Sequence, residues 1–352
     1  MIAGLLCCLL GGCTVVGPAA IKGGRLTYNE VIGETNNQQM LMAIIKNRYT
    51  ETGNLLAVAS VTANVSVTAS AGFQLGFGGE ENYSGNLVPF SAGTVYEENP
   101  TVSYTPVAGA KYARKLFSPV PISDLAQLTG TMHNPVHIYN TLVSNINGIQ
   151  NPAFLHTPED SDPRFSRIVA IMAELTRAHH LRWTEAAQKP GSFSLIIDRY
   201  APAYTDEVGE LLTLLGLSLP MDHTARVVLP VYLALDGRES GGIGITTRSI
   251  GELMEILSAA IEIPAADQRK GVAASYPSPG LAGRDLRIHH SVEQPEDAAV
   301  AVEYRDYWFY IDQSDQPTKR YFRMLGGLWS VTIAESARKG AAAPVLTVPV
   351  SR

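Results

Sequence analysis

The chain has 352 residues, of which 45% are hydrophobic and 17% charged, so it can bury a core and is not disordered over its length. The net charge is −6, and the densest basic cluster is Lys319, Arg320 and Arg323. A protein that binds a nucleic-acid duplex needs a concentrated basic surface, so this composition argues against nucleic acid as a partner.

The first predicted element is a secretion signal. Residues 2–10 are apolar, and they are too few to cross a bilayer as a helix, which takes about 20 residues. A short apolar run that ends in small residues is typical of a signal peptide, so we expect residues 1–12 to be removed. Only the amino group of Met1 supplies the usual positive charge, which fits a start further upstream. The alternative is an apolar N-terminal strand or helix.

All three cysteines lie in the first thirteen positions, and Leu10–Cys13, with the sequence LGGC, resembles the bacterial lipobox. The resemblance implies that the Cys13 thiol receives a diacylglycerol and that the new amino terminus is acylated, for example with palmitate. Two or more chains anchor stably, because each buried methylene contributes about 0.8 kcal/mol. Removal of Cys7 and Cys8 leaves no free thiol, which suits an oxidising periplasm. Thr14 resembles the class that is directed to the outer membrane.

A tether and a helix are predicted next. Residues 13–26 are rich in small residues and are interpreted as a lipidated tether. A helix is predicted over about residues 28–49, because apolar residues recur there at three- and four-residue steps, and Gly53 ends it. The residues of this periodic face are Met40, Leu41, Ile44, Ile45 and Tyr49.

The most regular pattern in the chain follows. From Ala59 to Phe77 every odd position is apolar, and every even position is polar or glycine. Alternation with period two predicts a β-strand, and this one is about three times the typical length. A second extended stretch from Thr94 is predicted to return along it. Pro100 and Pro106 restrict that strand to an edge or a bulged path.

The second half alternates between element types and predicts a mixed α/β body over residues 160–335 with a mainly antiparallel sheet. Residues 118–150 are predicted helical, with one helix running from Pro135 through Ile146 to a stop at Asn147-Gly148. A linker is predicted between residues 150 and 160, and a C-terminal tail over 336–352. Asp162 with Pro163 predicts the start of one helix, and Ser249 with Glu252 predicts a capping box at the start of another. Near the end we predict a turn at Arg305-Asp306, a helix over 317–325 and a strand over 328–333. The predicted fold is thus α+β, with an N-terminal helix and long β-hairpin in residues 27–150 ahead of the body.

Several segments resemble an uncharacterised family of proteobacterial lipoproteins. They include YNEVIGETNNQQMLMAIIKNRY, TTRSIGELMEILSAAIEIP and YRDYWFYIDQSDQPTKRYFRML, together with PTVSYTPV and APVLTVPV. The resemblance spans most of the mature chain. It implies a shared fold and an outer-membrane location, and it implies no catalytic residue.

The sequence contains no spacing typical of a catalytic or metal-binding motif. His133 and His137 are separated by Pro135, and the pairs His179-His180 and His289-His290 point in different directions on a regular element. Ser240 lies among glycines without the spacing of a hydrolase elbow, and no phosphate-binding glycine motif occurs. Asp312 and Asp315 are too few for calcium and fit a helix cap better. We therefore predict no catalytic residue, no metal and no cofactor.

The sequence favours a non-catalytic, lipid-anchored subunit of the bacterial envelope, structural or assembly-related, at the outer membrane with its body in the periplasm. The expected contact surface for a protein partner or a homo-oligomer is residues 27–115. One alternative is a subunit of an oligomeric outer-membrane pore that contributes one hairpin (57–107) per protomer, since about 9 to 11 alternating residues cross a membrane. A second alternative is an enzyme acting on envelope sugars or peptides.

Overall fold

The computed structural model describes residues 16–53, 55–73, 90–107, 110–131, 134–151, 162–186, 189–200, 202–218, 226–234, 241–276, 285–338 and 346–349. The fold is α+β, as predicted: an N-terminal helix and a long hairpin precede a mixed body with a mainly antiparallel sheet. The chain forms two compact units, which are described separately. We call them the hairpin unit (1–35, 55–107 and 337–352) and the body (36–54 and 108–336).

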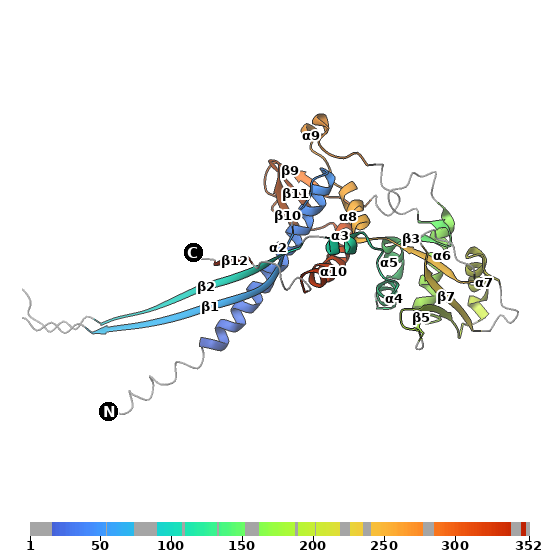
Figure 1. Ribbon diagram of the computed structural model, residues 1–352, viewed down its shortest axis with the longest axis horizontal. Helices are drawn as coiled ribbons and strands as arrows, with labels where there is room; N and C mark the ends of the chain where they lie inside the picture. Colours follow the sequence, from blue (N-terminus) through green and yellow to red (C-terminus); the bar gives the residue numbers. More distant parts are fainter. Residues whose placement is uncertain are drawn as a thin grey trace, which may run out of the picture. The chain divides into compact units, whose positions relative to one another are not determined.

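The hairpin unit contains the first part of one long helix and a three-stranded sheet in the order β1-β2-β12. Strands β1 and β2 run antiparallel beside each other, and the short β12 lies along β2 (Figure 1). The elements are α2 (Val16–Arg48), β1 (Leu55–Phe73), β2 (Phe90–Val107) and β12 (Leu346–Pro349).

Helix α2 begins at Val16, twelve residues before the predicted start. Residues 16–26, which were interpreted as part of a tether, are therefore helical. Pro18 is compatible with this start, because it lies in the first turn, where its missing N–H costs no intrahelical hydrogen bond. The predicted face of Met40, Leu41, Ile44 and Ile45 is buried in the body.

The body holds a six-stranded sheet in the order β4-β3-β8-β7-β6-β5, in which only the β7–β8 pair is parallel among the described strands. The strands are β3 (Val143–Ile146), β4 (Ile149–Gln150), β5 (Leu181–Glu185), β6 (Phe193–Ile197), β7 (Val227–Leu233) and β8 (Ile243–Thr247). Its core includes Leu195 and Ile245 from the sheet and the fully buried Phe165 and Ile168 from helix α6 (Pro163–Arg177).

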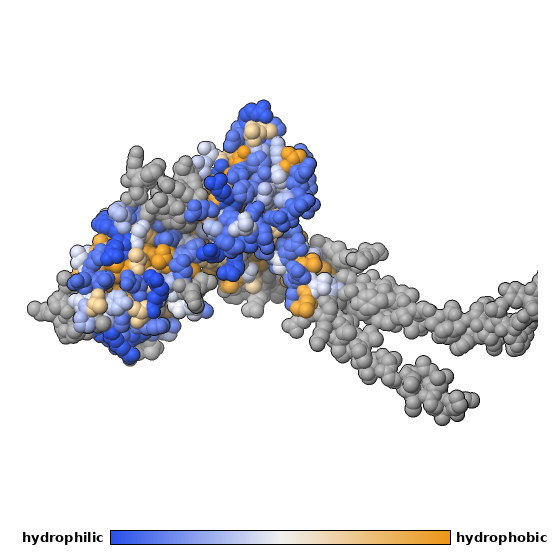
Figure 2. Space-filling model, turned by 180° about the vertical axis from the view of Figure 1, so that it is seen from behind, coloured by the Kyte–Doolittle hydropathy of each residue, from blue (hydrophilic) through white to orange (hydrophobic). Residues whose placement is uncertain are grey.

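A second, three-stranded sheet of the body has the order β10-β11-β9. Its strands are β9 (His289–Ser291), β10 (Ala298–Tyr304) and β11 (Tyr307–Asp312). The remaining helices are α3 (Ala110–Phe117), α4 (Ile122–Thr131), α5 (Pro135–Leu142), α7 (Thr205–Leu214), α8 (Ile250–Ala259), α9 (Ala265–Lys270) and α10 (Gln316–Arg338). Hydrophilic residues cover most of the described surface in Figure 2, in agreement with the burial of the periodic apolar positions.

Local capping signals placed two helices correctly. Asp162 accepts a hydrogen bond from the backbone N of Arg164 (3.0 Å) at the start of α6. Ser249 and Glu252 form the predicted capping box of α8, with Ser249 N donating to the Glu252 carboxylate at 2.8 Å. Each such cap satisfies backbone donors that the first helical turn leaves unpaired.

The compact units divide the chain differently from the predicted domains. Residues 110–151 pack with the body, and the division falls at residues 107 and 108 instead of between 150 and 160. Two contacts account for this: Val120 N donates to Arg248 O (3.0 Å), and strand β3 pairs with β8. Pairing between strands about 100 residues apart leaves no local trace in the sequence.

Two element predictions in the body were wrong. The predicted helix through Ile146 ends at Leu142, and residues 143–146 form β3 instead. The pair Asn147-Gly148, with φ of 49° and 82°, is the tight turn between β3 and β4 and not a helix stop. Two residues with positive φ are typical of the type I′ turn that closes short hairpins.

The predicted strand over 328–333 is part of α10, which runs without interruption through Gly326 and Gly327. The buried positions Phe322, Leu325, Trp329 and Thr332 repeat at helical spacing. A Cβ at Gly326 would lie 3.4 Å from Met40 Cε, so a small residue there allows α10 to approach the end of α2.

We expect Gly327→Ala to raise the free energy of unfolding by about 0.5–1 kcal/mol, because glycine is a poor helix former and a Cβ there meets nothing within 4 Å. Urea denaturation followed by circular dichroism measures this. Gly271→Ala is the matched control: its φ of 64° is left-handed, so we expect it to destabilise. A loss of stability in Gly327→Ala would indicate a break in α10.

Candidate functional site

The long hairpin is the main candidate surface, and its backbone register defines it. Above a bulge between Val58 and Ser60, fourteen consecutive pairs run from Ser60↔Ser103 to Phe73↔Phe90. Phe73 is the last described residue of β1, so Gln74 to Phe77 of the predicted alternation lie outside the described residues. The prediction of two paired extended segments is confirmed.

Residues directly opposite each other in an antiparallel pair lie on the same face of the ladder. The odd positions of β1 therefore share a face with the even positions of β2, as in Val65↔Glu98 and Val67↔Tyr96. From Ala63 to Phe73 the β1 positions on this apolar face are alanine, valine or phenylalanine. The partner positions on β2 are Pro100, Glu98, Tyr96, Thr94, Ala92 and Phe90.

The opposite face of the ladder carries mainly polar residue types. Its pairs are Ser60↔Ser103, Thr62↔Thr101, Asn64↔Asn99, Ser66↔Glu97, Thr68↔Val95, Ser70↔Gly93 and Gly72↔Ser91. The alternation predicted for β1 alone thus extends to both strands, with Val95 as an apolar exception on the polar face and Thr94 and Glu98 as polar exceptions on the apolar face.

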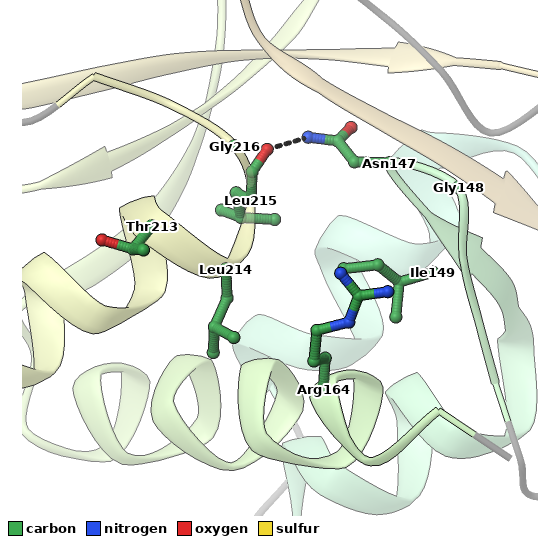
Figure 3. Close-up of a pocket in the computed structure, with 8 residues that line it drawn as sticks. All are labelled: Asn147, Gly148, Ile149, Arg164, Thr213, Leu214, Leu215 and Gly216. Carbon is green, nitrogen blue, oxygen red and sulfur yellow. Dashed lines mark hydrogen bonds between the residues drawn. The ribbon is translucent and has the colours of Figure 1, made fainter.

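A pocket of about 350 Å³ lies in the body between the β3–β4 turn and the ends of α6 and α7 (Figure 3). Among the described residues its lining contains no Asp, Glu or His; it consists of Asn147, Gly148, Ile149, Arg164, Thr213, Leu214, Leu215 and Gly216. Asn147 donates from Nδ2 to Leu215 O at 2.9 Å, so this side chain is already used to join two elements.

The one charged side chain of this lining is also engaged. The Arg164 guanidinium contacts the Asp162 carboxylate at 2.6 Å and lowers the pKa of that carboxyl group. Asp162 in turn caps α6. Arg164 and Asn147 therefore have structural roles, and the Thr213 hydroxyl in the same lining donates to Gly209 O at 2.8 Å.

The histidines occupy separate places. His137 is largely buried, and burial lowers its pKa. His179 sits at the end of α6 with φ of 61°. His289 Nδ1 lies 3.0 Å from the Glu262 carboxylate, and His290 packs against the ring of Tyr307. His133 and Ser240 lie outside the described residues. Among the described residues, no three metal-ligating side chains gather at one point.

The carboxylates of Asp312 and Asp315 accept hydrogen bonds from nearby residues of the chain. Asp315 accepts from Thr318 N at 3.0 Å, which makes it the predicted cap of α10, and Asp312 accepts from Ser314 N at 2.7 Å. Arg305 and Asp306 form the predicted turn between β10 and β11. Phe309 is fully buried on β11.

The sequence reasoning missed a cluster at the end of α2. The Tyr49 hydroxyl donates to the buried Asp267 carboxylate at 2.8 Å. The Tyr304 ring lies edge-on to the Tyr49 ring, with 5.1 Å between the ring centroids. The Arg305 guanidinium lies 5.1 Å from the centre of the Tyr49 ring and 3.6 Å from the Glu51 carboxylate. These contacts hold the end of α2 in the body. The only signal in the sequence was the helical spacing of Tyr49.

No family model, curated protein or solved structure matches the chain. None of the described helices has the length and apolar character needed to cross a bilayer.

Proposed function

We propose that this protein is a lipid-anchored structural or assembly subunit of the bacterial envelope, held at the outer membrane through Cys13 with its body in the periplasm. It acts by contact and not by catalysis. The LGGC sequence at Leu10–Cys13 supports the anchor, and the resemblance to proteobacterial lipoproteins supports the location. Residues 1–15 lie outside the described residues.

The observation that carries the contact role is the hairpin ladder. An exposed two-stranded hairpin is marginally stable by itself in water, and most strands have five or six residues. Here the β1 and β2 strands have 19 and 18 residues and one apolar face. Apolar surface of this extent is stabilised when a partner or a lipid phase covers it.

A second candidate is a subunit of an oligomeric outer-membrane pore to which each protomer contributes one hairpin. The separation of the two faces favours it, since one face suits lipid and the other water. The ten pairs from Asn64↔Asn99 to Phe73↔Phe90 match the roughly 9–11 residues of a membrane-crossing strand. Glu98 on the apolar face and Pro100 in β2 weigh against it.

Cys13→Ser tests the anchor. We expect the wild-type chain to remain with membranes through high-salt washing and to yield an acylated N-terminal peptide in mass spectrometry. The variant should move almost entirely to the periplasmic supernatant, because it lacks the acyl chains that supply the free energy of membrane binding in the wild type. Thr14→Ser, which leaves the cysteine in place, is the matched control.

An unmodified Cys13 thiol, or an intact leader in the mature protein, would contradict the anchor. A Cys13→Ser variant that is released as a monomer without detergent would contradict the pore. One that stays in the membrane until detergent is added would favour the pore over the simple contact role.

A further inference from the structure

The two outer edges of the hairpin indicate what kind of partner it can bind. Among the described strands, β1 pairs with β2 only, so beyond the bulge the outer edge of β1 carries no described partner strand along Ser60–Phe73. An edge strand presents a row of backbone N–H and C=O groups that can pair with a further strand. Natural sheets usually keep such edges short, bulged or covered, and this one is long.

Among the described strands, β12 alone pairs with the outer edge of β2, and it does so near the C-terminal end of β2. Strand β12 pairs there with Thr101–Tyr104, and Leu346↔Tyr104 and Pro349↔Thr101 are the two ends of that ladder. Above it, residues 90–100 of β2 pair with no other described strand on that side. The edge can therefore accept an antiparallel neighbour, and β12 limits a second neighbour to the first eleven residues of β2, 90–100.

A second copy of the same chain fits both edges. Within one hairpin β1 and β2 are antiparallel, so placing β1 of one copy beside β2 of the next continues the antiparallel alternation. The neighbour also carries the same two-residue alternation, so the apolar and polar faces stay continuous across the junction. Side chains alternate between the two faces of a strand, so a neighbour without this alternation would place polar residues on the apolar face.

We propose that copies of this chain assemble head to tail through their hairpins, with the outer edge of β1 in one copy paired to residues 90–100 of β2 in the next. The contact is heterologous, so each copy uses one edge for each of two neighbours; such contacts form a ring when the rotation between copies closes and an open filament when it does not. The inference rests on the contact role proposed above and names a second copy as the partner. It does not require the lipid anchor.

Disulfide cross-linking tests the pairing. Single cysteines are placed in β1 at Ser66, Thr68 or Ser70 and in β2 at Ser91, Gly93 or Val95, all on the polar face by register. The background is the full chain with Cys7, Cys8 and Cys13 replaced by serine, so the result is independent of acylation. Each differently tagged β1 variant is co-expressed with each β2 variant, oxidised, and run on a non-reducing gel.

We expect covalent β1–β2 pairs in a narrow register window, with at least tenfold more product than for mismatched positions. Ser103→Cys is the matched control for Ser91→Cys, because it lies on the same face of β2 where β12 occupies the edge; it should not cross-link to β1. Light scattering of the chain without added cysteines, after solubilisation in detergent, should give a multiple of the single-chain mass.

Three results would overturn the proposal: β1–β1 pairs in place of β1–β2 pairs, cross-linking without preference for position, or a monomeric mass with no cross-link. The first result would indicate a two-fold dimer, and the other two would indicate that the hairpin contacts something other than a second copy. Acylation of Cys13 is read separately by mass spectrometry, so the anchor and the assembly can fail independently.

Discussion

Arg248→Met is expected to lower the free energy of unfolding of the body by about 1.5–3 kcal/mol, because hydrogen bonds from a charged group to buried carbonyls are lost. Arg248 is 4% exposed and lies between β8 and the cap of α8. Its Nη1 donates to Asn140 O at 3.1 Å and to the carbonyls of Thr141 and Val143, each at 2.9 Å.

These carbonyls belong to the end of α5 and the start of β3, where the helix leaves its last acceptors unpaired and carries partial negative charge. Burial lowers the pKa of Arg248 to about 10, so the side chain stays charged at neutral pH. Methionine fills similar space but donates no hydrogen bond, so Thr141 O loses its guanidinium donor, and Asn140 O and Val143 O keep the bond from Asn151 Nδ2. Chemical denaturation with fluorescence detection measures the loss.

Arg167→Met is the control for charge alone. That guanidinium pairs with Glu210 and is 48% exposed, so its removal should change stability by less than about 1 kcal/mol. Arg248→Lys should be intermediate, because an ammonium keeps the charge but cannot reproduce the planar donor set. An Arg248→Met variant as stable as the wild type would show that the carbonyls find other donors.

Asn147→Ala is expected to destabilise the body by about 2–4 kcal/mol, since it removes several hydrogen bonds and leaves alanine in a left-handed conformation. Asn147 donates from Nδ2 to Leu215 O (2.9 Å) and Gly242 O (3.3 Å), and its Oδ1 accepts from Gly244 N at 2.6 Å. Its φ is 49°. The side chain thus joins the β3–β4 turn, the end of α7 and β8 (Figure 3).

Asn147→Gly separates the two contributions, because glycine removes the hydrogen bonds but tolerates the backbone angle; it should be about 1 kcal/mol more stable than Asn147→Ala. Thr213→Ala, at an exposed residue of the same pocket, is the control and should change stability by less than about 0.5 kcal/mol. Thermal and urea denaturation both report these differences. Equal stability of Asn147→Ala and wild type would contradict this role of the side chain.

The elements that were predicted correctly are those whose cause is local. The capping box of α8 involves residues three positions apart, and the alternation of β1 is a property of consecutive residues. The Asp162 cap and the Arg305-Asp306 turn are of the same kind. For such features, neighbouring residues decide the backbone conformation, so one sequence is enough.

The errors fall where distant contacts compete with local preference. Gly326-Gly327 is a typical helix break, yet α10 continues through it because Leu325 and Trp329 are buried on its inner face. Residues 143–146 keep a helical spacing of apolar residues but pair with β8 as a strand. In both places the burial and pairing available in the folded chain outweigh a propensity difference of about 1 kcal/mol.

The candidate site shows the same division. The sequence by itself determined the alternating strand, and it supplied the lipobox-like segment on which the proposed anchor depends. Only the tertiary structure decided which residues of β2 face which residues of β1, that β12 covers the base of one edge, and that Arg248 and Asn147 bind elements together. Register and edge occupancy depend on pairing between segments far apart in the chain, and no local pattern encodes that pairing.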